Sequence, residues 1–128
     1  MLIVGFVMAA LAALLHVFIF YLESVAWTTE RARATFGNSL DEAQATKQMA
    51  FNQGFYNLFL ALLAFGGIVA FAAGTAAIGL TLVFAGAGSM LAAALVLLIS
   101  SPSHRGAAIK QGTLPLLAVL SLVVGLLW

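Results

Sequence analysis

The stretch that decides the fold is residues 2–22, which read LIVGFVMAALAALLHVFIFYL. A helix needs about 20 predominantly apolar residues to cross the hydrocarbon core of a bilayer, and this stretch meets that length. His16 is its only polar interruption before Glu23. A cleaved signal peptide is the alternative, but it would have a positive n-region and a shorter apolar run. The pattern therefore predicts a retained membrane-spanning helix.

Three further apolar runs follow the first one. They cover about residues 54–72, 77–99 and 112–128, and Pro115 falls in the first turn of the last run, where a missing N–H costs little. Over the 128 residues, 64% are hydrophobic and 7% are charged, whereas soluble domains carry about a quarter charged residues. We therefore expect a single all-α domain, an up-and-down membrane four-helix bundle. The expected helices cover about residues 2–27, 40–72, 77–99 and 112–128.

The connections between these runs differ in length and polarity. Residues 73–76 (AGTA) predict a tight uncharged turn, and residues 100–111 predict a polar loop. In the first connection, Phe36-Gly37 is typical of a helix end with glycine in the left-handed conformation. Ser39 followed by Glu42 has the spacing of a capping box. The second long helix is therefore expected to begin near Leu40, above the membrane.

The basic residues predict the orientation. All five lie in the first and third connections, which four spans place on the same side: Arg31, Arg33, Lys47, Arg105 and Lys110. Cytoplasmic loops carry an excess of Lys and Arg, so this side is expected to be cytoplasmic and both termini extracytoplasmic. Trp27 and Trp128 stand at opposite ends of their helices, as an aromatic belt would place them. We expect a multi-pass protein of the bacterial inner (plasma) membrane.

Small residues predict how the helices pack. They recur on the second and third long helices, where they allow backbones to approach closely: Gly66, Gly67, Ala70, Gly79, Ala85, Gly86, Gly88, Ala92 and Ala93. Two interpretations remain open. The faces pack within one bundle, or one of them forms a homodimer.

Polar side chains within apolar helices are costly, so they are the candidate site residues. His16 and Glu23 lie seven apart, on one face of the first helix and about 10 Å apart along its axis, and Trp27 extends this stripe. The second helix offers adjacent polar rows at the same depth, and Gln111 begins the last helix at that level. We expect a polar pocket that opens toward the cytoplasm, with His16 at its apolar floor. The second-helix residues are Asn52, Gln53, Tyr56 and Asn57.

Each candidate also has a structural interpretation. Glu23 could mark the membrane boundary, reaching water or pairing with Arg31 or Lys47. The amides of the second helix could be interhelical hydrogen bonds, and His16 could bond to a neighbouring backbone carbonyl. A metal site is disfavoured because His16 and Glu23 lack the i,i+3 or i,i+4 spacing of two ligands on one helix, and no cofactor motif is present. A net charge of +1 offers no field for nucleic acid.

A recognisable series of residues runs through the first half of the chain. It consists of Glu23 and Trp27, then Phe36-Gly37, then NQGFYN at 52–57. In these residues the first half of the chain resembles a family of small four-helix bacterial membrane proteins of unknown function. The resemblance implies that Glu23, Trp27 and the NQGxYN residues form the signature of the family. It implies no activity.

The function expected from these residues is binding or transport of a small, partly apolar molecule or ion, with Glu23 as the charged contact. Trp27 and Tyr56 would add aromatic surface. The rival is an intramembrane enzyme that acts on a lipophilic substrate, with Glu23 or His16 as general acid or base. A third alternative is a subunit whose helix faces serve a partner protein.

Overall fold

The computed structural model describes residues 1–128, and nearly all of them are helical. The elements in chain order are α1 (Leu2–Phe20), the π-helix η1 (Tyr21–Val25), α2 (Glu30–Phe36), α3 (Leu40–Ala72), α4 (Ala76–Ser100), the 3₁₀ turn η2 (Pro102–His104) and α5 (Arg105–Leu127).

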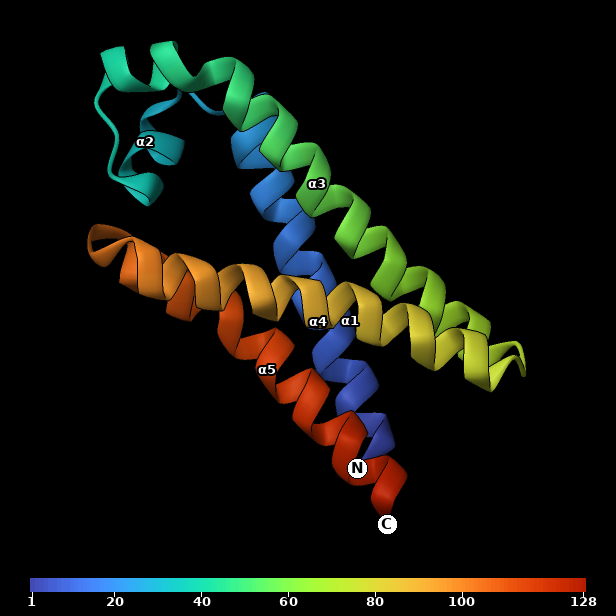
Figure 1. The fold of residues 1–128 in the computed structure, drawn as a ribbon. Helices are drawn as coiled ribbons and strands as arrows, with labels where there is room; N and C mark the ends of the chain where they lie inside the picture. The colour runs from blue at the N-terminus through green and yellow to red at the C-terminus, as the bar shows by residue number, and fades with distance from the viewer.

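The four long helices form an antiparallel bundle (Figure 1). α1 packs against α3 and α5, and α4 packs against the same two helices, so α1 and α4 are diagonal neighbours. Both termini lie together at one end of the bundle. The short helix α2 and the beginning of α3 lie at the opposite end, beside the connection from α4 to α5 (Figure 1). The connections therefore gather the polar segments at a single end.

The core consists mainly of small side chains. One buried cluster contains Ala9, Ala87 and Ala118, and a second contains Ala12 and Ala61. Small residues let helices approach until their backbones touch, which is the usual packing of helices in lipid.

Glycines bring α3 and α4 together. A Cβ added at Gly67 would lie 2.7 Å from the carbonyl oxygen of Gly79, and one at Gly86 would lie 2.9 Å from the amide nitrogen of Ala64. Added at Gly66 or Gly88, it would meet nothing. The intramolecular interpretation of the small residues therefore holds for Gly67, Gly79 and Gly86.

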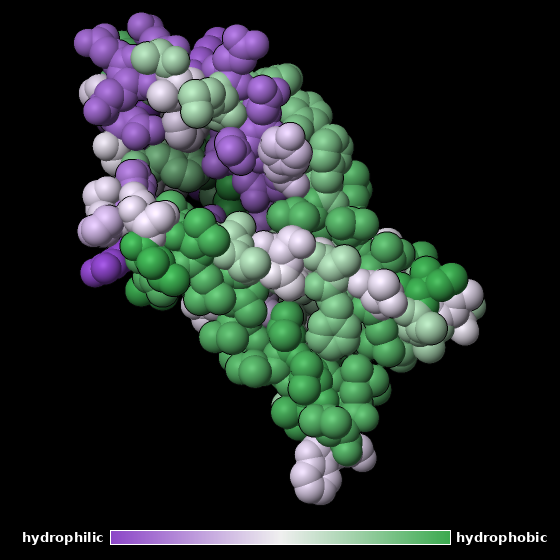
Figure 2. Space-filling model, viewed as in Figure 1, coloured by the Kyte–Doolittle hydropathy of each residue, from purple (hydrophilic) through white to green (hydrophobic).

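The outer surface of the bundle is apolar. Large side chains such as Ile3, Leu62, Val96 and Leu127 are exposed, and Figure 2 shows hydrophobic residues over the length of the bundle. Hydrophilic residues gather at the end formed by α2 and the start of α3 (Figure 2). The chain has four helices that are long and apolar enough to cross a membrane: Leu2–Val25, Leu40–Ala72, Ala76–Ser100 and Pro102–Leu127.

The predicted helix signals in the first connection are confirmed. Ser39 Oγ accepts from the Glu42 amide at 3.2 Å while the Glu42 carboxylate accepts from the Ser39 amide at 2.8 Å, which is a complete capping box. Gly37 ends α2 with φ of +74°. The tight turn after Ala72 is also present, with Gly74 at φ of +89°.

Two predicted boundaries were wrong. The first helix ends at Val25, not Trp27, and the last one begins at Arg105, not residue 112, so most of the predicted loop 100–111 is helical. Pro102 takes the first position of η2, which leads directly into α5. As a result Pro115, expected in the first turn of the last helix, lies inside α5. The error has a physical cause: hydropathy marks where a helix would enter hydrocarbon, whereas its hydrogen bonds continue into water.

Candidate functional site

Glu23 lies in a widened helical turn at the polar end of the bundle. The Ala26 amide donates to the Tyr21 carbonyl at 3.0 Å, five residues back, which makes Tyr21–Val25 a π-helix. π-helical turns are rare in proteins, and those that occur are often found at functional sites. Because the π-helical turn lies after His16 and contains Glu23, the regular α-helical spacing that would place these two residues on one face does not hold.

An amide of α3 holds the Glu23 carboxylate. Asn57 Nδ2 donates to Glu23 Oε2 at 2.8 Å and also to the Gln53 carbonyl at 3.2 Å. A carboxylate removed from water needs donors of this kind. The predicted contact between Glu23 and the polar row of α3 is confirmed. Arg31, one of the cations considered as a partner, instead lies over the Phe18 ring at 5.3 Å.

A close helix contact fixes the position of this turn. Ser24 Oγ donates to the Phe51 carbonyl at 2.8 Å. Gly54 lies directly opposite, and a Cβ there would overlap Ser24 Oγ and approach the Phe20 carbonyl oxygen to 3.0 Å. The rings of Phe20 and Phe55 pack edge to face at 5.1 Å on the same contact. Gly54 thus sets the distance at which Asn57 can reach Glu23.

Trp27 forms the aromatic side of the site. Its Nε1 donates to Thr46 Oγ1 at 3.2 Å, and the Thr46 hydroxyl donates to the Glu42 carbonyl at 2.7 Å. The Trp27 ring packs against Phe36 of α2, with centroids 5.1 Å apart and planes tilted by 48°. The indole is therefore held between α2 and α3.

These elements border an open hollow of about 260 Å³ beneath α2. Figure 2 shows the molecule hollowed there, between the polar end and α4. The nine residues that line it are Glu23, Trp27, Phe36, Asn38, Thr46, Met49, Ala50, Gln53 and His104.

The lining of the hollow carries a negative charge and no permanent positive charge. Glu23 is the only carboxylate in the lining, which contains no Lys or Arg. His104 lies at the edge contributed by η2, and its Nδ1 is 2.7 Å from Ser101 Oγ. Arg33 has a buried Nε without a hydrogen-bond partner, but it is not a lining residue.

The structure brings together only part of the predicted site. Glu23, Trp27 and Gln53 line the hollow, and Asn57 binds Glu23 from behind it. Asn52 and Tyr56 instead lie by a separate depression with Phe55 and Phe59, and Gln111 does not line the hollow.

The prediction that His16 forms the floor of the pocket was wrong, because His16 does not line the hollow. It is buried further along α1, where its Nδ1 donates to the Ala12 carbonyl at 2.8 Å. That is the structural alternative considered for this residue.

Sequence reasoning missed most of the α3 lining. Thr46, Met49, Ala50 and Gln53 follow the i, i+3, i+4, i+7 spacing of one helix face. This periodicity could have been found, because Gln53 was already a candidate. Nothing in the sequence predicted Asn38 or His104, since the chain path around α2 and η2 places them.

No group of three or more His, Asp or Glu side chains is arranged to hold a metal ion. What the arrangement offers chemically is one carboxylate, an indole and amide groups around a small hollow at the polar end of an apolar bundle. These features define an all-α protein with four candidate membrane spans.

The chain belongs to the family described as protein of unknown function (DUF1304), whose family model matches residues 10–123. The match includes Glu23 and the NQGFYN segment, and it continues through α4 into α5. No curated protein and no solved structure matches the chain.

Proposed function

We propose that this protein is a multi-pass protein of the inner (plasma) membrane with both termini outside and the hollow open to the cytoplasm. The four apolar helices support insertion. All five basic residues occur in the segments at the α2 end of the bundle, which supports the orientation.

We further propose that the hollow binds a small, partly apolar molecule that carries a cationic ammonium group. One observation carries this proposal: the Glu23 carboxylate bonds to a neutral amide, not to a cation, and it shares the hollow with Trp27 and Phe36. A carboxylate whose charge no residue of the lining balances favours a positive ligand.

The aromatic rings narrow the class of ligand. Trp is the best aromatic partner for a cation, and quaternary ammonium ligands are typically held by aromatic side chains. A volume of about 260 Å³ is just below the usual range for small-molecule sites, about 300–1,000 Å³. Met49 and Ala50 give the ligand an apolar contact. The site therefore suits a small alkyl or aryl ammonium ion.

The enzyme alternative has less support. An acid–base pair of Glu23 and His16 requires both groups to reach one substrate, and His16 is bonded to its own helix outside the hollow. Binding, with or without transport, is therefore the function that the geometry supports best.

The test is a titration in detergent that follows the fluorescence of Trp27 in a Trp128→Phe background. Benzyltrimethylammonium is the cationic probe and benzylsulfonate the anionic control. The cation should bind and the anion should not. Glu23→Gln should weaken cation binding about ten-fold, equal to about 1.4 kcal/mol, because the amide keeps the shape and loses the charge.

Glu30→Gln is the matched control, since Glu30 is an exposed carboxylate of α2 outside the hollow. The affinity of the Glu30→Gln protein for benzyltrimethylammonium should equal that of the wild type. Equal weakening by the two substitutions, or equal binding of the anion and the cation, would contradict the proposal.

A further inference from the structure

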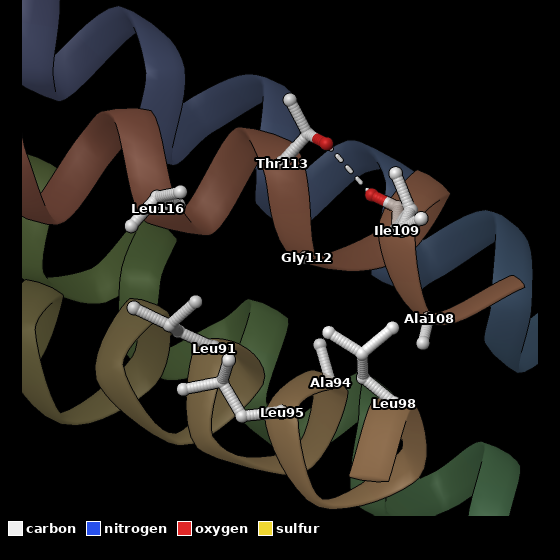
Figure 3. Close-up of a pocket in the computed structure, with 9 residues that line it drawn as sticks. All are labelled: Leu91, Ala94, Leu95, Leu98, Ala108, Ile109, Gly112, Thr113 and Leu116. Carbon is white, nitrogen blue, oxygen red and sulfur yellow. Dashed lines mark hydrogen bonds between the residues drawn. The ribbon is translucent and has the colours of Figure 1, made fainter. Parts of the chain in front are cut away.

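A second hollow lies on the outer face of the bundle, between α4 and α5. It is a groove of about 180 Å³, drawn in Figure 3, and its residues are Leu91, Ala94, Leu95, Leu98, Ala108, Ile109, Gly112, Thr113 and Leu116. Small residues from both helices meet there. A Cβ on Gly112 would come within 2.8 Å of the Ala94 Cβ, so the two helices touch at this point while the larger side chains stand around it.

The groove offers no free polar group to a ligand. Thr113 is the only lining residue with a polar side chain, and its hydroxyl donates to the Ile109 carbonyl at 2.7 Å, the dashed line in Figure 3. Leu95 and Ile109 are exposed beside it. The groove is thus suited to a hydrocarbon chain.

One end of the groove carries a positive charge. Arg105 Nε donates to the carbonyl oxygen of Leu98, a groove residue, at 3.2 Å, so the guanidinium lies where the groove meets the polar end of the bundle. Residues 76–128 contain no Asp or Glu, and their only formal charges are Arg105 and Lys110. Arg105 is exposed. Its charge is therefore uncompensated within these two helices.

We propose that the groove between α4 and α5 binds one anionic phospholipid, with an acyl chain along the groove and the phosphate on Arg105. From Ala108 to Leu116 the groove runs about 12 Å at 1.5 Å per residue, which suits a stretch of extended chain. Basic sites beside membrane helices recognise anionic headgroups. A second copy of the chain, packed on the same face, would instead bring like charges together.

The test is native mass spectrometry of the purified protein with phosphatidylglycerol or phosphatidylcholine of identical acyl chains. The wild type should retain one phosphatidylglycerol in preference to phosphatidylcholine. Arg105→Gln should weaken phosphatidylglycerol binding about five-fold, the effect expected of one basic residue near a membrane surface. Lys47→Gln, an exposed basic residue of α3, is the control and should leave binding unchanged.

A second pair of variants tests the groove itself. Ile109→Trp places a large ring at the groove and should reduce retention of phosphatidylglycerol, whereas Leu117→Trp changes an exposed residue of α5 outside the groove and should not. Equal retention of the two lipids by the wild type would overturn the proposal. So would equal effects of Arg105→Gln and Lys47→Gln, or of the two Trp substitutions.

Discussion

Replacement of Gly54 by Ala should separate the two helices that build the Glu23 site. Gly54 is buried in α3, where an added Cβ would overlap Ser24 Oγ and lie 3.0 Å from both the Phe20 carbonyl oxygen and the Ser24 amide nitrogen. Two of these three atoms belong to the backbone. The contact can therefore be relieved only if the helices move apart.

The cost follows from three terms. Overpacking of a tight contact costs about 1–3 kcal/mol. Loss of the Ser24–Phe51 hydrogen bond adds about 1 kcal/mol. Ala regains about 1 kcal/mol through its higher helix propensity. The net destabilisation should be about 1–3 kcal/mol, with the Asn57 amide withdrawn from Glu23.

Thermal unfolding in detergent measures this change, and Gly66→Ala on the same helix is the control because its Cβ would meet nothing within 4 Å. Gly54→Ala should lower the midpoint by several degrees, and Gly66→Ala should leave it unchanged or raise it. If both variants unfold at the same temperature, the close contact between η1 and α3 does not hold the site.

Three further predictions concern the connections and the topology. Ser39→Ala should lose about 1 kcal/mol of cap stability and increase hydrogen exchange in the first turn after Leu40; unchanged exchange there would rule out the capping box as the helix start. Gly37→Ala should destabilise the protein by about 1–2 kcal/mol, because Gly37 has a left-handed φ; no neighbouring atom lies within 4 Å of the added Cβ, so the backbone conformation alone causes this cost. A thermal midpoint equal to that of the wild type would argue against the left-handed conformation. Reporter fusions at Trp128 and in the turn 73–76 both lie at the end opposite α2, so both should report the extracytoplasmic side; a cytoplasmic Trp128 would reverse the proposed orientation.

The four long apolar helices could be predicted because hydrocarbon would impose a strong length and polarity requirement on every helix that crosses it. The start of α3 could be predicted as well, since Ser39 and Glu42 satisfy a local rule that needs no tertiary contact. The start of α5 could not, because Arg105 and Lys110 lower the hydropathy of a segment that continues as helix.

The site was only partly predictable for the same reason. Depth along the helices put Glu23 opposite the polar row of α3, and the hydrogen bond to Asn57 agrees. Rotation about a helix axis is not fixed by depth. Two polar rows at one level appear equivalent in the sequence, yet packing at Gly54 turns Gln53 and Asn57 toward α1 and leaves Asn52 and Tyr56 on another face.

The central proposal is that Glu23 and Trp27 bind a cation together. The most direct measurement is a solid-state NMR distance, in lipid bilayers, between ¹³C-methyl benzyltrimethylammonium and the ¹⁵N-labelled indole of Trp27 in the Trp128→Phe protein. With the ligand held at the concentration that half-saturates the unaltered site, the proposal predicts a contact within about 6 Å. Glu30→Gln should retain this contact, and Glu23→Gln should weaken its signal several-fold. Absence of the contact from the protein with Glu23 in place, or a signal of equal strength in Glu23→Gln and Glu30→Gln, would contradict the proposed function.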